Sequence, residues 1–308
     1  MEIAIDFGGT NIKLGLIDGG QARDLATLPA YSGQGLLKRL PAVEQAVLDM
    51  LKRHEISLDQ CRGIGLAIPG IVDFAAGQLL SVNKKYADAI GFHFAGWAAD
   101  TFCLRSVLEN DARAALIGEV AHGAAQGERD VVLVSFGTGI GTSAMIDGKV
   151  LRGKHHLAGI LGGHFVTGDM GVLCNCGNAG CLEAQASHWA LPRLFRSHLH
   201  HSSSVLKEHE DLSYLTLLQA ADAGDRVASE LAEQLILQWG AGLVNMVHAY
   251  DPELVVLSGG LMKSASRVLP QLAAYVHKHA WAPWGKVRIT AAARPELSVL
   301  LGVSHLLG

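Results

Sequence analysis

The chain has 308 residues, of which 49% are hydrophobic and 18% are charged, and its formal net charge is -4. A chain of this length exceeds the size at which one core usually divides, so we expect two lobes. The chain has no surplus of basic residues of the kind that would indicate a nucleic-acid-binding protein. No apolar run reaches membrane-spanning length and no signal peptide is evident, so we expect a cytoplasmic protein.

The N-terminal part of the chain predicts a β-hairpin followed by alternating strands and helices. Gly8-Gly9 joins the first two strands, and Asp18-Gly19-Gly20 leads to the third. Pro69-Gly70 ends a buried strand, and Glu109-Asn110-Asp111 separates a strand from an Ala-rich helix that runs to about residue 120. We expect strands over residues 3–7, 12–17, 24–28, 63–68 and 106–108, and a helix over 36–53.

From Val131 onward the same pattern begins again. Gly137-Thr138-Gly139 joins two strands over 131–136 and 140–146, as Gly8-Gly9 does in the first half. A helix over 228–248, strands over 254–257 and 287–291, and a last helix over 296–307 complete the prediction. The recurrence predicts two related lobes, each contributing one glycine-rich turn to a shared cleft.

Three glycine-rich segments have the composition of a phosphate site. The first carries Asp6, Gly8, Gly9, Thr10, Asn11 and Lys13. Glycine allows backbone N–H groups to approach a polyphosphate, Thr10 and Lys13 offer a donor and a charge, and Asp6 is suited to holding Mg²⁺ through water. Because no helix follows the glycines, this is neither a P-loop nor a Rossmann motif. An ordinary tight hairpin is the alternative for one such turn, but Gly137, Thr138 and Gly139 form a second, and Gly259 and Gly260 form a third that is suited to adenosine.

Asp111 is a candidate general base. At the start of a helix an Asp is most often an N-cap, which is the structural alternative. Near phosphate-binding turns, however, a carboxylate can take the proton from a substrate hydroxyl that attacks the γ-phosphate. Asn110 would then form a hydrogen bond with a neighbouring hydroxyl of the substrate.

His164, Cys174, Cys176 and Cys181 are candidate ligands of a structural zinc ion. Three thiolates and one imidazole complete a tetrahedral site and leave no position for substrate. Gly177 and Gly180 allow the backbone to bring close-spaced thiolates together. Chance thiols or a disulfide are the alternatives, and a disulfide is disfavoured in a chain without an export signal.

These motifs together resemble the ROK family of repressors and sugar kinases, within the hexokinase–actin ATPase superfamily. The resemblance rests on Asp6-Phe7-Gly8-Gly9-Thr10, Ile68-Pro69-Gly70, Glu109-Asn110-Asp111, Phe136-Gly137-Thr138-Gly139, Gly163-His164 and the Cys-x-Cys-Gly-x-x-Gly-Cys-Leu-Glu run. It implies an α/β fold of two ribonuclease-H-like lobes, each a mixed β-sheet flanked by helices. The first lobe would be residues 1–112, with the helix at about 296–308 packed back on it, and the second 113–295.

The resemblance also implies an activity, ATP-dependent phosphorylation of a hexose or N-acyl-hexosamine in a closing cleft, with Mg²⁺. It implies sugar contacts from Gly70, Asn83, Asn110, Asp111, His164 and Glu183, so that His164 would serve both zinc and sugar. We also expect a homodimer.

Two departures from the family pattern bear on the substrate. Leu161 stands where relatives that act on glucose-like sugars have a Glu, so we expect a sugar other than plain glucose; a core position for Leu161 is the alternative. Asn83-Lys84-Lys85-Tyr86 replaces the usual Asn-Leu-x-x-Trp. Its two lysines either lie in solvent, the simpler alternative, or meet an acidic or phosphorylated sugar.

The family also offers two other functions. A sugar-responsive repressor would carry an N-terminal helix-turn-helix, for which we expect no room because the first strand begins at residue 3. A sugar-binding regulatory protein with weak or no kinase activity is the second alternative, and Leu161 keeps it open.

Overall fold

A computed structural model describes residues 1–168, 170–209 and 211–308. The chain divides into two compact units. The first comprises Met1–Gly127, Val150–Ala158 and Ala292–Gly308, and the second comprises Glu128–Lys149 and Gly159–Ala291. The lobe boundary expected at residue 112 instead falls inside the first unit, within the helix Asp111–His122.

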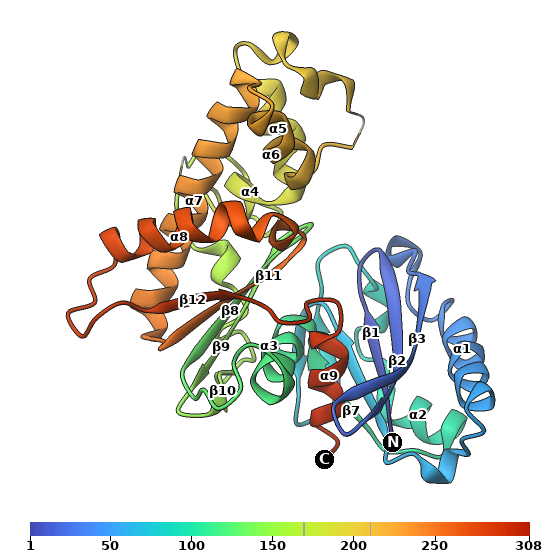
Figure 1. Ribbon diagram of the computed structural model, residues 1–308. Helices are drawn as coiled ribbons and strands as arrows, with labels where there is room; N and C mark the ends of the chain where they lie inside the picture. Colours follow the sequence, from blue (N-terminus) through green and yellow to red (C-terminus); the bar gives the residue numbers. More distant parts are fainter. Residues whose placement is uncertain (169, 210) are drawn as a thin grey trace. The chain divides into compact units, whose positions relative to one another are not determined.

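The first unit is built on a mixed sheet in the order β3-β2-β1-β4-β7 (Figure 1). β1 pairs antiparallel with β2 and parallel with β4, and β4 pairs parallel with β7. Its strands are β1 Glu2–Phe7, β2 Asn11–Asp18, β3 Gln21–Pro29, β4 Ile64–Ile68 and β7 Ser106–Asn110, with a side hairpin of β5 Ile71–Asp73 and β6 Gln78–Ser81. Its helices are α1 Leu40–Arg53, α2 Phe94–Phe102, α3 Asp111–His122 and α9 Ser298–His305.

The alternation of β1 explains how helices cover both faces of this sheet. Ile3, Ile5 and Phe7 point into a core shared with α1 and α2. Ala4 points to the other face, where it meets the buried residues of α9 and Ala114 of α3. Small residues on that face bring α9 very close to the sheet, because a Cβ at Gly65 of β4 would overlap the backbone of Val303.

The second unit repeats this sheet topology. Its order is β10-β9-β8-β11-β12, again a hairpin followed by two parallel strands. The strands are β8 Val131–Phe136, β9 Ile140–Ile146, β10 Lys149–Val150, β11 Leu254–Gly259 and β12 Arg288–Ala291. The helices are α4 Leu182–Ala186, α5 Leu191–Ser197, α6 Tyr214–Asp222, α7 Arg226–Tyr250 and α8 Ala265–His279. The predicted fold of two related mixed sheets flanked by helices is confirmed.

The structure departs from the predicted elements at several places. The helix expected from residue 36 begins at Leu40, because Leu36–Arg39 form a turn in which the Arg39 N–H donates to the Leu36 carbonyl at 2.7 Å. Pro41 fits the first turn of a helix that begins at Leu40, but it would break one that began at residue 36. The short elements β5, β6, α2, α4, α5 and α6 and the longer helix α8 were not predicted.

Within the described part of the chain, no helix combines the length and apolar character needed to cross a lipid bilayer.

Candidate functional site

The carboxyl ends of three neighbouring strands gather the predicted polar residues of the first unit. β1 ends near Asp6, β4 leads into Pro69-Gly70, and β7 ends at Asn110. The strands are in register, since Asp6 pairs with Ala67 and Ile68 with Asn110. The Asn110 Nδ2 donates to the Gly70 carbonyl at 2.9 Å and to Asp111 Oδ1 at 3.0 Å. Sequence positions forty residues apart therefore share one edge of the sheet, where open α/β sheets bind ligands.

The cap of α3 is made by Asn110, not by Asp111. The Asn110 Oδ1 accepts from the backbone N–H groups of Ala112 at 3.0 Å and Arg113 at 3.1 Å. Asn110 has extended backbone angles and is the N-cap residue, while Asp111 is already helical, so Asp111 does not occupy the N-cap position that the structural alternative gave it. The Asp111 Oδ1 nevertheless accepts from the Ala112 N–H at 2.9 Å, so both side chains bond this donor.

Asp6 and Asp111 are two carboxyl groups that influence one another. Burial and the Asp111 charge raise the pKa of Asp6 to about 7, against an opposing effect of Lys13. Burial also raises the pKa of Asp111, and hydrogen bonds and the Lys85 ammonium partly offset it. A pair with raised pKa values at the end of a sheet is the arrangement expected of a proton acceptor and a cation site.

The first glycine-rich turn lies between β1 and β2, next to these carboxyl groups. Thr10 and Asn11 are exposed and Gly8 and Gly9 are partly exposed, so the backbone of the turn is open to a ligand. Lys13 pairs with Asp6 across the hairpin, and its Nζ donates to the Glu296 carbonyl at 3.3 Å. The ammonium of Lys13 is thus directed to the segment before α9.

The second glycine-rich turn, Gly137-Thr138-Gly139, contacts Glu183 within the second unit. The Glu183 Oε2 accepts from the Ile140 N–H at 2.8 Å, and a Cβ at Gly139 would collide with this carboxylate. The third segment is adjacent, because β11 pairs with β8 so that Gly259 lies opposite Phe136. Gly259 has a φ of 85°, and a Cβ there would overlap the Phe136 carbonyl, so glycine is required.

The predicted zinc ligands gather in the second unit. The ligand atoms of His164, Cys174, Cys176 and Cys181 lie within 4.8 Å of one another. The Cys176 and Cys181 Sγ atoms are 3.7 Å apart, and His164 Nδ1 is 3.6 Å from Cys174 Sγ. A tetrahedral zinc with bonds of about 2.3 Å to sulfur and 2.0 Å to nitrogen requires separations of about 3.8 and 3.6 Å. The donors fit this ion, and the sulfurs are too far apart for the disulfide alternative, whose S–S bond is about 2.05 Å.

The local backbone explains why these ligands meet. Gly177 and Gly180 have φ values of 91° and 74°, which L side chains rarely adopt. The Cys174 N–H donates to the Asn178 carbonyl at 2.8 Å, which closes a tight loop around Cys176. His164 comes from the short 3₁₀ turn Gly162–His164, and a Cβ at Gly163 would overlap the Ile140 carbonyl.

Leu161 lies just before that turn, and its side chain is 38% exposed. The alternative that buried it in the core is therefore wrong. Asn83 is exposed on the segment after β6, in the first unit.

Three residues that the sequence did not connect with the first glycine-rich turn contact it. The Tyr86 hydroxyl donates to the Gly8 carbonyl at 2.8 Å, and the Ser32 hydroxyl donates to the Gly9 carbonyl at 2.7 Å. The Lys85 side chain lies on Gly9 itself. No short-range signal indicates these contacts, because they join segments that are far apart in the chain.

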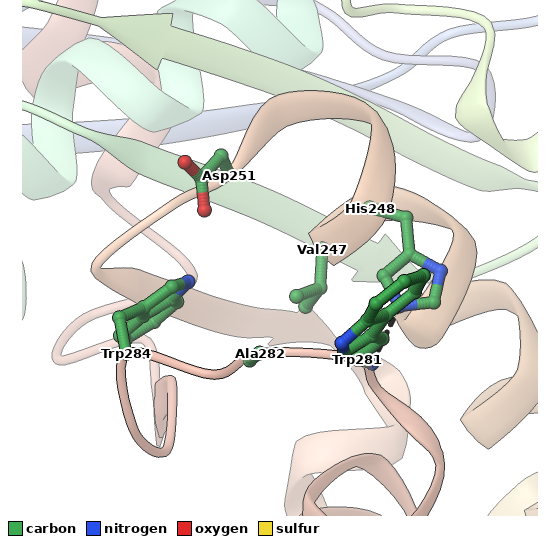
Figure 2. A pocket seen from close by; sticks show the side chains of 6 residues that line it. All are labelled: Val247, His248, Asp251, Trp281, Ala282 and Trp284. Carbon is green, nitrogen blue, oxygen red and sulfur yellow. Dashed lines mark hydrogen bonds between the residues drawn. The ribbon is translucent and has the colours of Figure 1, made fainter.

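A pocket of 290 Å³ in the second unit contains none of the predicted site residues (Figure 2). It lies between the end of α7 and the segment before β12, and its lining is Val247, His248, Asp251, Trp281, Ala282 and Trp284. The Trp281 N–H donates to His248 Nε2 at 2.8 Å, which fixes one wall. The pocket is separate from the glycine-rich turns and from the cysteine cluster.

Comparison with known proteins finds sugar kinases and repressors among the relatives of this chain. The chain is 28% identical over 285 residues to a glucokinase of Halalkalibacterium halodurans, which covers 90% of this chain and 86% of that protein. It is 27% identical over 222 residues to the xylose repressor of Bacillus spizizenii, but this match spans 68% of the chain and about half, 54%, of the repressor. A Streptomyces griseus ROK family glucokinase, solved in complex with glucose and AMPPNP, superposes with a TM-score of 0.82 and 26% identity over 99% of this chain and 98% of that one.

The sequence profile of the ROK family matches residues 2–307. Enzymes that phosphorylate sugars are therefore among the relatives of this chain, together with repressors. The match spans nearly every element of both units, and the chain belongs to the ROK family.

Proposed function

We propose that this protein transfers the terminal phosphoryl group of ATP to a hydroxyl of a hexose or an N-acyl-hexosamine. The observation that carries the proposal is the position of Asp111, a half-buried carboxyl that influences Asp6, has a raised pKa and is not the N-cap residue of its helix. Similarity to the H. halodurans and S. griseus glucokinases supports the same activity.

Asp111 acts as the general base. Its carboxylate accepts the proton of the substrate hydroxyl while the hydroxyl oxygen forms a bond to the γ-phosphorus. The bond between the γ-phosphorus and the bridging oxygen breaks, and ADP leaves with that electron pair. The Asn110 Nδ2 donates hydrogen bonds to the Gly70 carbonyl and to Asp111 Oδ1. Asn110 therefore orients the base and the side of the site that faces the sugar.

The nucleotide is held by the three glycine-rich segments. Asp6, Gly8, Gly9, Thr10, Asn11 and Lys13 serve the phosphates in the first unit, and Gly137, Thr138, Gly139, Gly259 and Gly260 serve the nucleotide in the second. Asp6 is the group that would hold Mg²⁺, which neutralises charge on the phosphates when it is bound. The sugar is met by Gly70, Asn83, Asn110, Asp111, His164 and Glu183.

The four-residue cysteine and histidine cluster would hold zinc as a structural ion. His164 Nδ1 faces Cys174, so the second ring nitrogen is the one available to a sugar hydroxyl. A closed site of this kind fixes the 3₁₀ turn and the start of α4, which carry His164 and Glu183.

The first prediction tests the base. Asp111→Asn should lower kcat by at least about 10²-fold, because the amide cannot accept the proton. The variant should fold normally, since Asn110 supplies the cap. Monosaccharides are screened by thermal shift, and hits are assayed by coupled release of ADP.

Asp49→Asn, at an exposed position of α1, is the matched control and should keep full activity. Near-normal turnover by Asp111→Asn would refute the assignment of the base. A wild-type protein that binds a sugar but turns over none would favour the regulatory alternative, for which similarity to xylose repressors is the supporting observation.

A further inference from the structure

The segment after β6 folds back onto the first glycine-rich turn. Tyr86 is fully buried, packs edge-on against Phe7 with ring centroids 6.4 Å apart, and donates its hydroxyl proton to the Gly8 carbonyl. Its backbone N–H donates at 2.9 Å to the carbonyl of Ser32, whose hydroxyl in turn holds the Gly9 carbonyl. Two hydrogen bonds and one ring contact therefore fix this segment to the turn.

This anchoring places the side chain of Lys85 along Gly9. A Cβ at Gly9 would lie 2.5 Å from Lys85 Nζ, 2.8 Å from Cε and 3.0 Å from Cδ. The end of the Lys85 side chain therefore occupies the space that the side chain of any other residue at position 9 would fill. Lys85 is partly buried, whereas Lys84 beside it is exposed.

The backbone on both sides of Lys85 is held in an unfavourable conformation. Lys84 and Tyr86 have φ values of 59° and 53°, in the left-handed region that is unfavourable for a non-glycine residue. Such conformations persist where surrounding contacts determine them, and they cluster at functional sites. Here the contacts of Tyr86 offset the cost, and the result is the position of Lys85.

The charges around Lys85 are those of the proposed transfer site. Burial raises the pKa of Asp111, and the Lys85 ammonium is close enough to this carboxyl to lower its pKa in part. The other lysine of the turn, Lys13, is directed to the Glu296 carbonyl. Lys85 is thus the amine that reaches both the glycine-rich turn and the candidate base.

We propose that Lys85 binds the γ-phosphate of ATP and stabilises the negative charge on the phosphoryl group during its transfer. The inference rests on the proposed kinase function. A base that deprotonates the attacking hydroxyl lies next to the phosphoryl group, so an ammonium between that base and the phosphate-binding turn is within reach of the same group. An acidic or phosphorylated sugar is disfavoured as the occupant, because the lysine lies on Gly9 and not on the Gly70–Asn110 contact.

The test compares Lys85→Met with Lys84→Met, a neighbouring lysine whose side chain is exposed. Binding of AMPPNP and of ADP is measured by calorimetry without sugar, and kcat is measured with the best sugar. Lys85→Met should weaken AMPPNP binding by about tenfold while ADP binding changes less than about twofold, because only AMPPNP carries a γ-phosphate. It should lower kcat by about 10²-fold or more, and Lys84→Met should change none of these values by more than about twofold.

Lys85→Arg provides a rescue, because it restores the charge and should recover part of the AMPPNP preference. An unchanged ratio of AMPPNP to ADP affinity in Lys85→Met, or an equal loss in Lys84→Met, would overturn the inference. A loss confined to sugar affinity would also overturn it, in favour of an anionic sugar. Nucleotide binding is measured without turnover, so a wild-type protein that phosphorylates no sugar would refute the proposed function alone.

Discussion

Asp6 gives the first unit a stability that depends on pH. Its pKa is about 7 in the folded protein and about 3.9 in an unfolded chain. The folded state therefore binds more protons between these values, and the contribution of Asp6 to the free energy of unfolding falls as pH rises from about 4 to about 7. Above pH 7 Asp6 is ionised in the folded protein, so the full free-energy cost of burying this charge is present there. A carboxylate that would hold Mg²⁺ has to be ionised in the same way.

Asp6→Asn should remove this cost. Without Mg²⁺, the melting temperature of the variant relative to wild type should rise by at least about 3 °C between pH 5 and pH 8, as expected for one or more kcal/mol in a protein of this size. Mg²⁺ with nucleotide should stabilise the wild type and have little effect on the variant. A difference that stays constant over this pH range would contradict the assigned ionisation.

We expect Leu161 to influence which sugar is preferred. Its side chain is 38% exposed and precedes the turn that carries His164, so its replacement does not open a cavity in the core. Leu161→Glu should raise kcat/KM for glucose relative to the native substrate by about ten- to a hundredfold, because one charged hydrogen bond is worth roughly 1.5–3 kcal/mol. Steady-state kinetics on glucose and on the best hit of the sugar screen measure the ratio. The prediction fails if glucose is already the best substrate of the unmodified protein.

At the scale of elements, the sequence predicted what short-range pattern determines. The two hairpins, β4, β7, β8, β11 and the long α7 follow from alternation, from glycine turns and from helical spacing. The cysteine cluster also follows, because three of its ligands lie within eight residues. The short α4, α5 and α6 carry too few turns for a periodic signal, and α4 and α6 are stabilised by packing on α7.

The sequence did not reveal two features of the site, the cap of α3 and a contact between distant segments. Which residue caps α3 depends on the backbone angles at Asn110. The sequence does not reveal these angles, because Asn110 and Asp111 are both polar residues that are suited to a cap. Lys85 reaches Gly9 only because Tyr86 and Ser32 return to the β1–β2 turn. The cap spans only three residues, but the contact of Lys85 with Gly9 has no signature within a window of a few residues.

A zinc ion at the cluster of His164, Cys174, Cys176 and Cys181 would join an irregular segment to α4, so its loss should unfold this region. Cys176→Ser should abolish zinc binding and lower the melting temperature, because metal binding and local folding are one equilibrium. Cys103→Ser, an exposed free cysteine in the first unit, is the control and should keep one zinc per chain. Elemental analysis provides the metal content. A native protein without zinc, or a Cys176→Ser protein that retains it, would refute the site.

At the scale of the whole molecule, the first unit is assembled from three separate stretches of chain. The buried Arg113 of α3 donates from Nη2 to the carbonyls of His156 at 2.8 Å and Ala158 at 3.0 Å, which attaches the middle stretch. The buried Glu119 accepts from the Ala293 N–H at 3.1 Å and from the Ser298 hydroxyl, which attaches the last stretch. One helix thus holds both returning segments.

The crossing of α3 and α9 depends on glycine at Gly118 and Gly302. A Cβ at Gly302 would overlap the Ala114 carbonyl, and one at Gly118 would overlap the Ser298 carbonyl. Gly302→Ala should lower the free energy of unfolding by at least about 2 kcal/mol, since rigid backbone must move apart. Gly33→Ala, where an added Cβ would meet nothing within 4 Å, should change it by less than about 0.5 kcal/mol. Urea unfolding of both variants measures the difference, and equal midpoints would contradict the close crossing.

The return of α9 also has a consequence for biosynthesis. A ribosome makes Met1–Gly127 first, but the helix that covers Ala4, Gly65 and α3 belongs to Ala292–Gly308, which is made after the whole second unit. Until then the nascent first unit exposes one apolar face of its sheet, and such a surface is where aggregation and chaperone binding begin. The second unit can complete its own core earlier. Synthesis of Ala292–Gly308 therefore sets the earliest moment at which the unit carrying Asp111 becomes stable.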